Sequence, residues 1–360
     1  MKIFKRVLKI LLAVAAVFVL AVVGYLIYLL VDYERIEDKQ ELAINNNTDA
    51  YVTTETDYEI ITYNIGFAAY TPEFSFFMDG GTESRAFSKQ SVLDTMNGIS
   101  KLLKEEDADF VMLEEVDKKS TRSYHVDERG ILIDELGSAY NSVYAVNYDS
   151  SYLFYPFNEP HGKSLSGLLT FSKYTIESSV RRSLPIETSL MKYVDLDRCY
   201  SVSRVPVDNG KELILYTVHL SAYTSDGTIA TEQLKMLIAD MTEEYNKGNY
   251  IVCGGDFNKD LLGDSSKYFG VSGEEFTWAQ PFPFELLNNT PFTVCAALDE
   301  KNPLPTCRDT EKPIFDGQFV LSVDGFIVSD NVSVSGCQVV NGDFIYSDHN
   351  PVSMIFRLEP

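Results

Sequence analysis

The stretch Tyr250-Ile251-Val252-Cys253-Gly254-Gly255-Asp256-Phe257-Asn258 has the pattern of a buried strand that ends in a polar turn. An apolar run leads in, and two consecutive glycines permit a tight backbone turn where a side chain would clash. Asp256 and Asn258 stand two residues apart, so both side chains can point to the same side of an extended backbone. The stretch therefore places a carboxylate and a carboxamide at one strand end, although an ordinary Asx turn uses the same residues.

The rest of the chain alternates strands and helices around this stretch. Apolar runs predict strands over residues 59–64, 109–115, 143–147, 167–172, 213–220, 322–328 and 352–356. Helical spacing predicts helices from Ser88, over 128–136 and from Leu234 to Tyr245, the last one ending before Gly248. The aromatic segment 67–87 is predicted to be a loop that buries its own rings or contacts substrate. The alternation indicates one α/β domain over residues 58–360.

The N-terminal part has the features of a membrane anchor. Residues 1–9 carry Lys2, Lys5, Arg6 and Lys9, and the apolar run 10–31 that follows exceeds the roughly 20 residues needed to cross a bilayer. A cleavable signal is the alternative, but its apolar region is usually about 7–15 residues long. The basic flank predicts a cytoplasmic N-terminus, which makes this a single-pass protein of the cell membrane with an extracellular C-terminal domain. Residues 32–57 are predicted to form a short polar tether between the anchor and the domain.

The composition restricts the function. The net charge of −23 disfavours non-specific nucleic-acid binding, which needs clustered Lys and Arg. The five cysteines have no C-x-x-C spacing, which disfavours a zinc site. A bridge between Cys295 and Cys307 is left open, and Cys253 is expected to be a small buried residue. Nothing in the sequence indicates a protein partner.

Several predicted strands end in residues that can bind a metal or transfer a proton. They are Asn64, Glu115, His219, Asp256, Asn258, Asp324, Asp348 and His349. Converging carboxylates repel one another, and a hard divalent cation removes the difficulty: Mg²⁺ first, with Mn²⁺ or Ca²⁺ as alternatives. Such an ion also neutralises a phosphate, and a histidine supported by an aspartate can hold phosphate or accept a proton. The pattern therefore predicts hydrolysis of a phosphorylated substrate. The other two histidines, His125 and His161, are expected in surface loops.

The ordered set of motifs resembles the endonuclease/exonuclease/phosphatase superfamily. The motifs are Tyr63-Asn64, Leu113-Glu114-Glu115, Thr217-Val218-His219-Leu220, Gly255-Asp256-Phe257-Asn258, Val323-Asp324 and Ser347-Asp348-His349-Asn350-Pro351. The resemblance extends from about Tyr58 to Phe356. It implies a four-layer α/β sandwich, in which two packed β-sheets are flanked by helices and the site lies at one sheet edge.

The resemblance also implies a role for each motif residue. Glu115 would be the principal metal ligand, assisted by Asn64 and Asp348, while Asp256 would orient or activate the attacking water. The resemblance further assigns phosphate binding to Asn258, the role of general base or transition-state stabiliser to His349 held by Asp324, and a phosphate contact or general acid to His219. The chain has Glu114 where the family more often has Gln. Arg198 and Arg204 are the candidates for a further phosphate contact.

The sequence as a whole predicts a membrane-anchored, outward-facing, divalent-metal-dependent phosphodiesterase or phosphatase. Its substrate is left open among a nucleic acid, a phospholipid and a small phosphorylated sugar, inositol or nucleotide. The overall acidity disfavours a nuclease. A sphingomyelinase-like enzyme would expose apolar side chains to the bilayer, for which Trp278, Phe282 and Phe284 are candidates unless they are buried. The alternative of another class is a catalytically silent interaction module on the same scaffold.

Overall fold

The structure is a computed structural model that describes residues 2–46, 48–186, 192, 196–222, 228–271, 280–315, 317–340 and 342–360. One sheet consists of β2 (Ile44–Asn45), β3 (Asp57–Asn64), β4 (Phe110–Asp117), β5 (Asn141–Asp149), β6 (Leu165–Ser172), β15 (Val332–Val339) and β16 (Val352–Leu358). The other consists of β1 (Gln40–Glu41), β7 (Ser178–Ser183), β8 (Cys199–Pro206), β9 (Glu212–His219), β10 (Tyr250–Asp256), β11 (Phe292–Ala296) and β14 (Asp324–Ser329).

The two sheets have a related strand order. The first runs β15-β16-β3-β4-β6-β5-β2 and the second β1-β7-β8-β9-β10-β14-β11. Within each, one central pair is parallel, β3 with β4 and β9 with β10, and the strands beside these pairs are antiparallel to them. A small separate sheet joins β12 (Cys307–Arg308) to β13 (Val320–Leu321).

Helices cover the outer face of each sheet and complete the four layers predicted from the sequence. The helices are α2 (Lys89–Glu106), α3 (Glu128–Leu136), α4 (Thr228–Asn246) and the short α5 (Ser266–Phe269), with single 3₁₀ turns at Gly66–Ala68, Phe77–Asp79, Gly137–Ala139 and Phe284–Leu287. Apolar side chains of α2 and α3 pack on the first sheet and those of α4 on the second. A third cluster, with Met112, Val252 and Phe326 among its members, fills the space between the sheets.

The predicted elements are present with small changes in their ends. The helix predicted from Ser88 begins one residue later, because the Ser88 hydroxyl accepts a hydrogen bond from the Ser91 amide and caps it. The predicted helix 128–136 is α3. The aromatic segment 67–87 does bury several of its rings, and Phe67 and Phe74 are fully enclosed beneath α2.

Two predictions made outside the sheets need correction, and the pairing of Cys295 with Cys307, which the sequence left open, is resolved. Residues 32–57 are not a free tether, since β1 pairs with β7, β2 pairs with β5 and Val52 is fully buried. His161 is not on the surface: its Nδ1 lies 2.8 Å from the Ser84 carbonyl oxygen, and burial lowers its pKa to about 4. Cys295 and Cys307 are both free thiols.

The remaining predictions of this kind have mixed outcomes. Cys253 is buried and His125 is exposed, as expected. Of the three residues considered for contact with a bilayer, Phe282 is buried and Phe284 is exposed. Trp278 lies outside the described residues.

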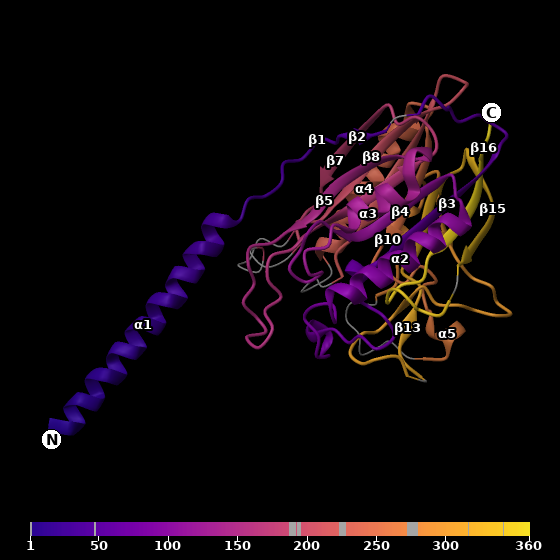
Figure 1. Ribbon diagram of the computed structural model, residues 1–360. Helices are drawn as coiled ribbons and strands as arrows, with labels where there is room; N and C mark the ends of the chain where they lie inside the picture. Colours follow the sequence, from indigo (N-terminus) through magenta and orange to yellow (C-terminus); the bar gives the residue numbers. More distant parts are fainter. Residues whose placement is uncertain are drawn as a thin grey trace.

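Helix α1 (Lys2–Asp32) extends away from the domain (Figure 1). The helix is long enough to cross a bilayer, and an 18-residue window within it has a mean hydropathy of 3.0. Nearly all of its side chains are exposed.

Gly255 lets β10 pass close to β9 immediately before the site. Its φ of +148° lies in the region that side chains rarely adopt, and a Cβ there would stand 2.0 Å from the Val218 carbonyl oxygen. Gly255→Ala is therefore expected to lower the free energy of unfolding by about 3 kcal/mol, measured by urea denaturation of the full chain in detergent.

Gly210→Ala is the matched control for this substitution. Gly210 also has a positive φ, +80°, but nothing lies within 4 Å of its added Cβ. The free energy of unfolding of Gly210→Ala should fall by about 1 kcal/mol, because only backbone strain is added. Equal losses in the two variants would contradict the steric account.

Candidate active site

The site forms where the two parallel strand pairs end. Asn64 closes β3 opposite Glu114 of β4, and Asp256 closes β10 opposite His219 of β9. Because the carboxyl ends of parallel strands meet at one edge, polar residues from distant parts of the sequence are brought together. Asp324, the first residue of the antiparallel β14, lies opposite Asp256 from the other side.

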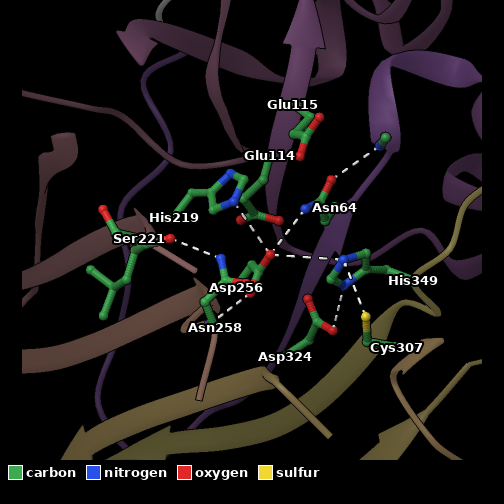
Figure 2. A network of polar contacts seen from close by, with 12 residues as sticks. Asn64, Glu114, Glu115, His219, Ser221, Asp256, Asn258, Cys307, Asp324 and His349 are labelled. Atoms are coloured by element: carbon green, nitrogen blue, oxygen red, sulfur yellow. Dashed lines mark hydrogen bonds and ion pairs between the residues drawn. The ribbon is translucent and has the colours of Figure 1, made fainter. Parts of the chain in front are cut away.

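The Asp256 carboxylate is the centre of this network, as Figure 2 shows. Its Oδ2 accepts a hydrogen bond from Asn64 Nδ2 at 3.1 Å and lies 3.4 Å from His219 Nε2 and 3.8 Å from His349 Nε2. Its Oδ1 accepts a hydrogen bond from the backbone amide of Asn258 at 2.8 Å. The carboxylate is 2% exposed and is therefore fixed in orientation by groups from several segments.

His349 and Asp324 form a hydrogen-bonded pair. His349 Nδ1 lies 2.8 Å from Asp324 Oδ2, so Nδ1 carries the proton and Nε2 is directed towards Asp256 and the Cys307 sulfur, which is 3.6 Å away. The backbone amide of Asp324 donates to the Thr306 hydroxyl, which holds the start of β14. The Ser347 hydroxyl donates to the Asn64 carbonyl oxygen at 2.7 Å and ties the His349 loop to β3.

A bulge in β4 presents two consecutive glutamates near the site. In a regular strand they would point to opposite faces, but the register with β6 shifts between Leu113 and Val116, and Glu115 has a φ of +55°. Glu114 is fully buried, and its Oε1 accepts a hydrogen bond from the Thr62 hydroxyl. Glu115 remains partly accessible, with 24% of its side chain exposed.

Arg122 supports this bulge and was not singled out from the sequence. Its guanidinium makes two hydrogen bonds to Asp117, at 2.9 and 3.1 Å, lies 3.8 Å from Glu115 and stacks 3.9 Å from the centre of the Phe67 ring. In the sequence it follows the run Glu114 to Lys119, which has the appearance of a solvated charged stretch. Its burial depends on the tertiary structure.

The pKa values of His349 and His219 are shifted in opposite directions. Burial by itself lowers the pKa of His349, but Asp324 and the neighbouring acids outweigh burial and hold the pKa well above its ordinary value. Burial, reinforced by Arg198, holds the pKa of His219 well below the ordinary value. These shifts favour the cationic form of His349 and the neutral form of His219.

Burial and repulsion from neighbouring acids raise the pKa values of acidic residues in the site. Burial first, then Asp324 and Asp256, raise the pKa of Glu114 well above its ordinary value. Burial likewise raises the pKa of Asp348 to about 6, with Glu115 contributing and the neighbouring cations opposing. Among the described residues, Glu114 Oε2, Asp324 Oδ1 and His219 Nδ1 have no hydrogen-bond partner although they are buried.

This donor set fits a hard divalent cation. Oxygen ligands are available from the Asn64 carboxamide and from the carboxylates of Glu114, Glu115, Asp256, Asp324 and Asp348, and two buried carboxylate oxygens lack partners. Ligand atoms of Asp256, Asp324 and His349 lie within 4.8 Å of one another, yet the His349–Asp324 hydrogen bond already occupies two of them. The assignment of Glu115, Asn64 and Asp348 as metal ligands, which the resemblance implied, stays a prediction.

The two arginines predicted to contact phosphate behave differently. Arg198 is buried beside the site, with a terminal nitrogen 3.5 Å from the His219 carbonyl oxygen. Arg204 is not at the site: it pairs with Glu212 and Glu244 and aligns with Ile214, five residues along β9 from His219. The prediction for Arg204 is wrong, because spacing alone does not show which end of β8 faces the site.

The other predicted residues converge. Asn64, His219, Asp256, Asn258, Asp324 and His349 are within one hydrogen-bonding network, and Glu115 adjoins it (Figure 2). Thr306 and Cys307 also belong to the site but carry no sequence signal of their own, since single small polar residues are common in loops. Ser347 was quoted only as the first residue of the motif that contains His349. Asn258 turns its amide to the Leu220 carbonyl oxygen at 2.8 Å, so in this state it braces the two strand ends.

With this geometry in view, comparison with known proteins gives a consistent result. Residues 61–349 match the family described as "Endonuclease/Exonuclease/phosphatase family". The match covers most of the chain and includes every site residue named above, and the chain belongs to this family. A search of curated proteins finds no match.

Solved structures show the same fold at low sequence identity. An endonuclease/exonuclease/phosphatase from Beutenbergia cavernae DSM 12333 has a TM-score of 0.57 and 17% identity, covering 84% of this chain and 72% of that one. One from Bacteroides vulgatus has a TM-score of 0.54 and 17% identity, covering 85% and 100%. ANGEL2, a 2',3'-cyclic phosphatase in complex with adenosine-2',3'-vanadate, has a TM-score of 0.57 and 16% identity, covering 90% and 100%.

Arg122→Met tests the support of the bulge. The substitution leaves the Asp117 carboxylate buried without its cation, so the free energy of unfolding should fall by about 3 kcal/mol. Asp117→Asn in the same chain should recover part of the loss, because the unpaired charge is removed. Arg357→Gln is the control, since Arg357 pairs with Asp57 at the surface and should matter by less than about 1 kcal/mol. Equal effects of the Arg122 and Arg357 substitutions on urea unfolding would refute this role.

Proposed function

We propose that the protein is a divalent-metal-dependent hydrolase of phosphate esters whose catalytic domain is held outside the cell membrane by α1. The observation that carries the proposal is the Asp256 carboxylate, placed between neutral His219 and cationic His349 and beside a set of oxygen ligands. Membership of the family supports phosphoester chemistry, and enzymes of the family are generally dependent on divalent metals. The 2',3'-cyclic phosphatase among the similar structures is consistent with this class of reaction.

The metal would be held by Glu115, Asn64 and Asp348, with Mg²⁺ as the first choice and Mn²⁺ or Ca²⁺ as alternatives. When bound, such an ion supplies charge neutralisation for the phosphate and for the leaving oxygen. The pair of free carboxylate oxygens on Glu114 and Asp324 adds negative charge around this position. Glu114 replaces the more common Gln, and its raised pKa lets it remain protonated and neutral while no ion is bound.

The residues on the other side of the phosphate would handle the water and the developing charge. Asp256 is fixed by Asn64 and Asn258, which suits a group that orients a water and accepts its proton. Cationic His349, held by Asp324, is suited to stabilise negative charge on the phosphate oxygens. Neutral His219 directs Nε2 to Asp256 and leaves Nδ1 available, and Arg198 lies behind it as a further positive group.

The distribution of charge around α1 supports an outward position of the domain. Lys2, Lys5, Arg6 and Lys9 precede the apolar run, and basic residues favour the cytoplasmic side. The net charge of −23 disfavours a nucleic acid as the substrate, which leaves a phospholipid headgroup or a small phosphorylated molecule.

Turnover by the full chain in detergent with Mg²⁺ tests the proposal. DNA, sphingomyelin, inositol phosphates and a chromogenic phosphodiester form the substrate panel, and at least one should be hydrolysed in a reaction that a chelator stops. His349→Ala and Asp324→Asn should each lower kcat by about 10²–10⁴-fold, because both remove the fixed cation from the transition state.

His125→Ala is the control, since the His125 side chain is exposed and its Nδ1 contacts the Lys119 carbonyl oxygen outside the hydrogen-bonding network of the site. Its kcat should equal that of the wild type. An absence of turnover on the whole panel, or turnover that His349→Ala leaves unchanged, would favour a catalytically silent interaction module.

A further inference from the structure

Residues 151–160, called the aromatic loop here, present large apolar rings to the outside. The exposed fractions are 49% for Phe154, 63% for Tyr155 and 85% for Phe157. Single exposed apolar residues are ordinary on a protein surface, but three aromatic rings within four residues are a continuous apolar patch. Burial of this patch against water-free surroundings would be favourable.

The aromatic loop contacts α1 directly. The Tyr25 hydroxyl donates to the Tyr152 carbonyl oxygen at 3.1 Å, and the Tyr152 amide donates to the Tyr28 hydroxyl at 3.0 Å. The Phe154 ring meets the Tyr25 ring edge-on, with centroids 5.1 Å apart. The exposed patch is thus continuous with the surface of the apolar helix, beside its C-terminal end (Figure 1).

The position of Tyr25 along α1 indicates how deep the aromatic loop would lie in a bilayer. Asp32 is the first acidic residue after the apolar run and marks the level at which the helix reaches water. Tyr25 lies seven residues earlier, which is about 10 Å deeper at 1.5 Å per residue. When α1 spans a bilayer, a loop in contact with Tyr25 therefore lies at the boundary between headgroups and acyl chains, where aromatic rings are favoured.

The positions of the charged residues near the aromatic loop are consistent with a loop at the membrane interface. The Lys163 ammonium lies 3.9 Å from Asp32 and 3.8 Å from Asp149, which groups the ionic residues at the base of the loop. The chain from Tyr152 to Asn158 carries none. Because the protein is strongly acidic overall, attraction to anionic lipids does not favour the contact, and apolar burial has to provide it.

The aromatic loop also packs against the segment that borders the active site. The Tyr155 ring lies 5.8 Å from the Phe77 ring, and Phe76 lies 5.6 Å from Tyr70. Tyr70 in turn is near enough to Asp348 and Glu115 for both to raise its pKa, after burial as the main cause. Because the Phe76 and Phe77 rings also contact each other, a series of packed rings connects the aromatic loop to Tyr70 beside the site.

We propose that the aromatic loop inserts Phe154, Tyr155 and Phe157 into the lipid interface beside α1, so that the domain lies against the bilayer in one orientation. The partner is the bilayer itself, in the leaflet where α1 emerges next to the domain. The inference rests on the anchoring part of the proposed function and is independent of the hydrolytic part.

Depth-dependent fluorescence quenching in vesicles tests this insertion. The full chain with Trp278→Phe and Phe157→Trp has one tryptophan, and it is reconstituted into phosphatidylcholine vesicles with bromine on the upper acyl chain. Its emission should be quenched about twofold or more relative to unbrominated vesicles, because a ring at the interface touches the bromines. Acrylamide in the water should quench it less than it quenches the control.

Tyr51→Trp in the same Trp278→Phe background is the matched control. Tyr51 is also exposed, and its neighbour Val52 pairs with Val207, just after the C-terminal end of β8. The segment that follows α1 lies near the opposite end of β8, because Arg181 donates to the carbonyl oxygens of both Asp197 and Ile36. Its emission should be unaffected by brominated lipid.

Equal quenching in the two variants, or failure of the chain to stay with the vesicles on flotation, would overturn the insertion. Hydrolysis of the chromogenic diester is measured in the same samples. Turnover without quenching refutes the inference alone, and quenching without turnover refutes the hydrolase alone.

Discussion

The crowding of buried carboxylates at one end of two packed sheets is the constraint on which the rest of the structure depends. Glu114, Asp256 and Asp324 are almost fully excluded from water, and Glu115 and Asp348 adjoin them. Such a cluster is unfavourable unless positive charge is supplied. Within the described residues part of that charge comes from His349, Arg122 and Arg198, and the remaining imbalance suits a divalent cation. In the proposed function, the same imbalance would favour binding of that cation.

The fold keeps this unfavourable cluster in place through its two parallel strand pairs. Each pair ends at the same edge, so the sheet hydrogen bonds hold Asn64 by Glu114 and His219 by Asp256. Gly255 permits the close approach of β10 to β9, and the bulge in β4 turns Glu115 out of the alternation of the strand. The apolar cores on both faces of each sheet then stabilise a geometry that the site residues alone would not adopt.

The sequence was sufficient for the residues that recur at strand ends, and insufficient for residues whose role arises from tertiary contacts. Asp256 and His219 end apolar runs, Asp324 lies at the start of one and His349 precedes one, and these positions at strand ends predicted their meeting. Arg122 lies in a run of charges that is typical of a surface, and only its pairing with Asp117 buries it. His161 lies in a loop and is enclosed by Phe76 and Phe77. The two-residue strands β1 and β2 are too short to show a period, so residues 32–57 resembled a tether.

The position of the bound cation is the most direct test of the account. Crystals of the protein soaked in Mn²⁺ would show it by anomalous scattering, since Mn²⁺ accepts the same oxygen ligands as Mg²⁺. The account predicts one strong peak bounded by Glu115, Asn64 and Asp348, with the His349–Asp324 hydrogen bond intact. A peak that displaces this hydrogen bond and uses His349 as a ligand, or no peak at the site, would contradict it.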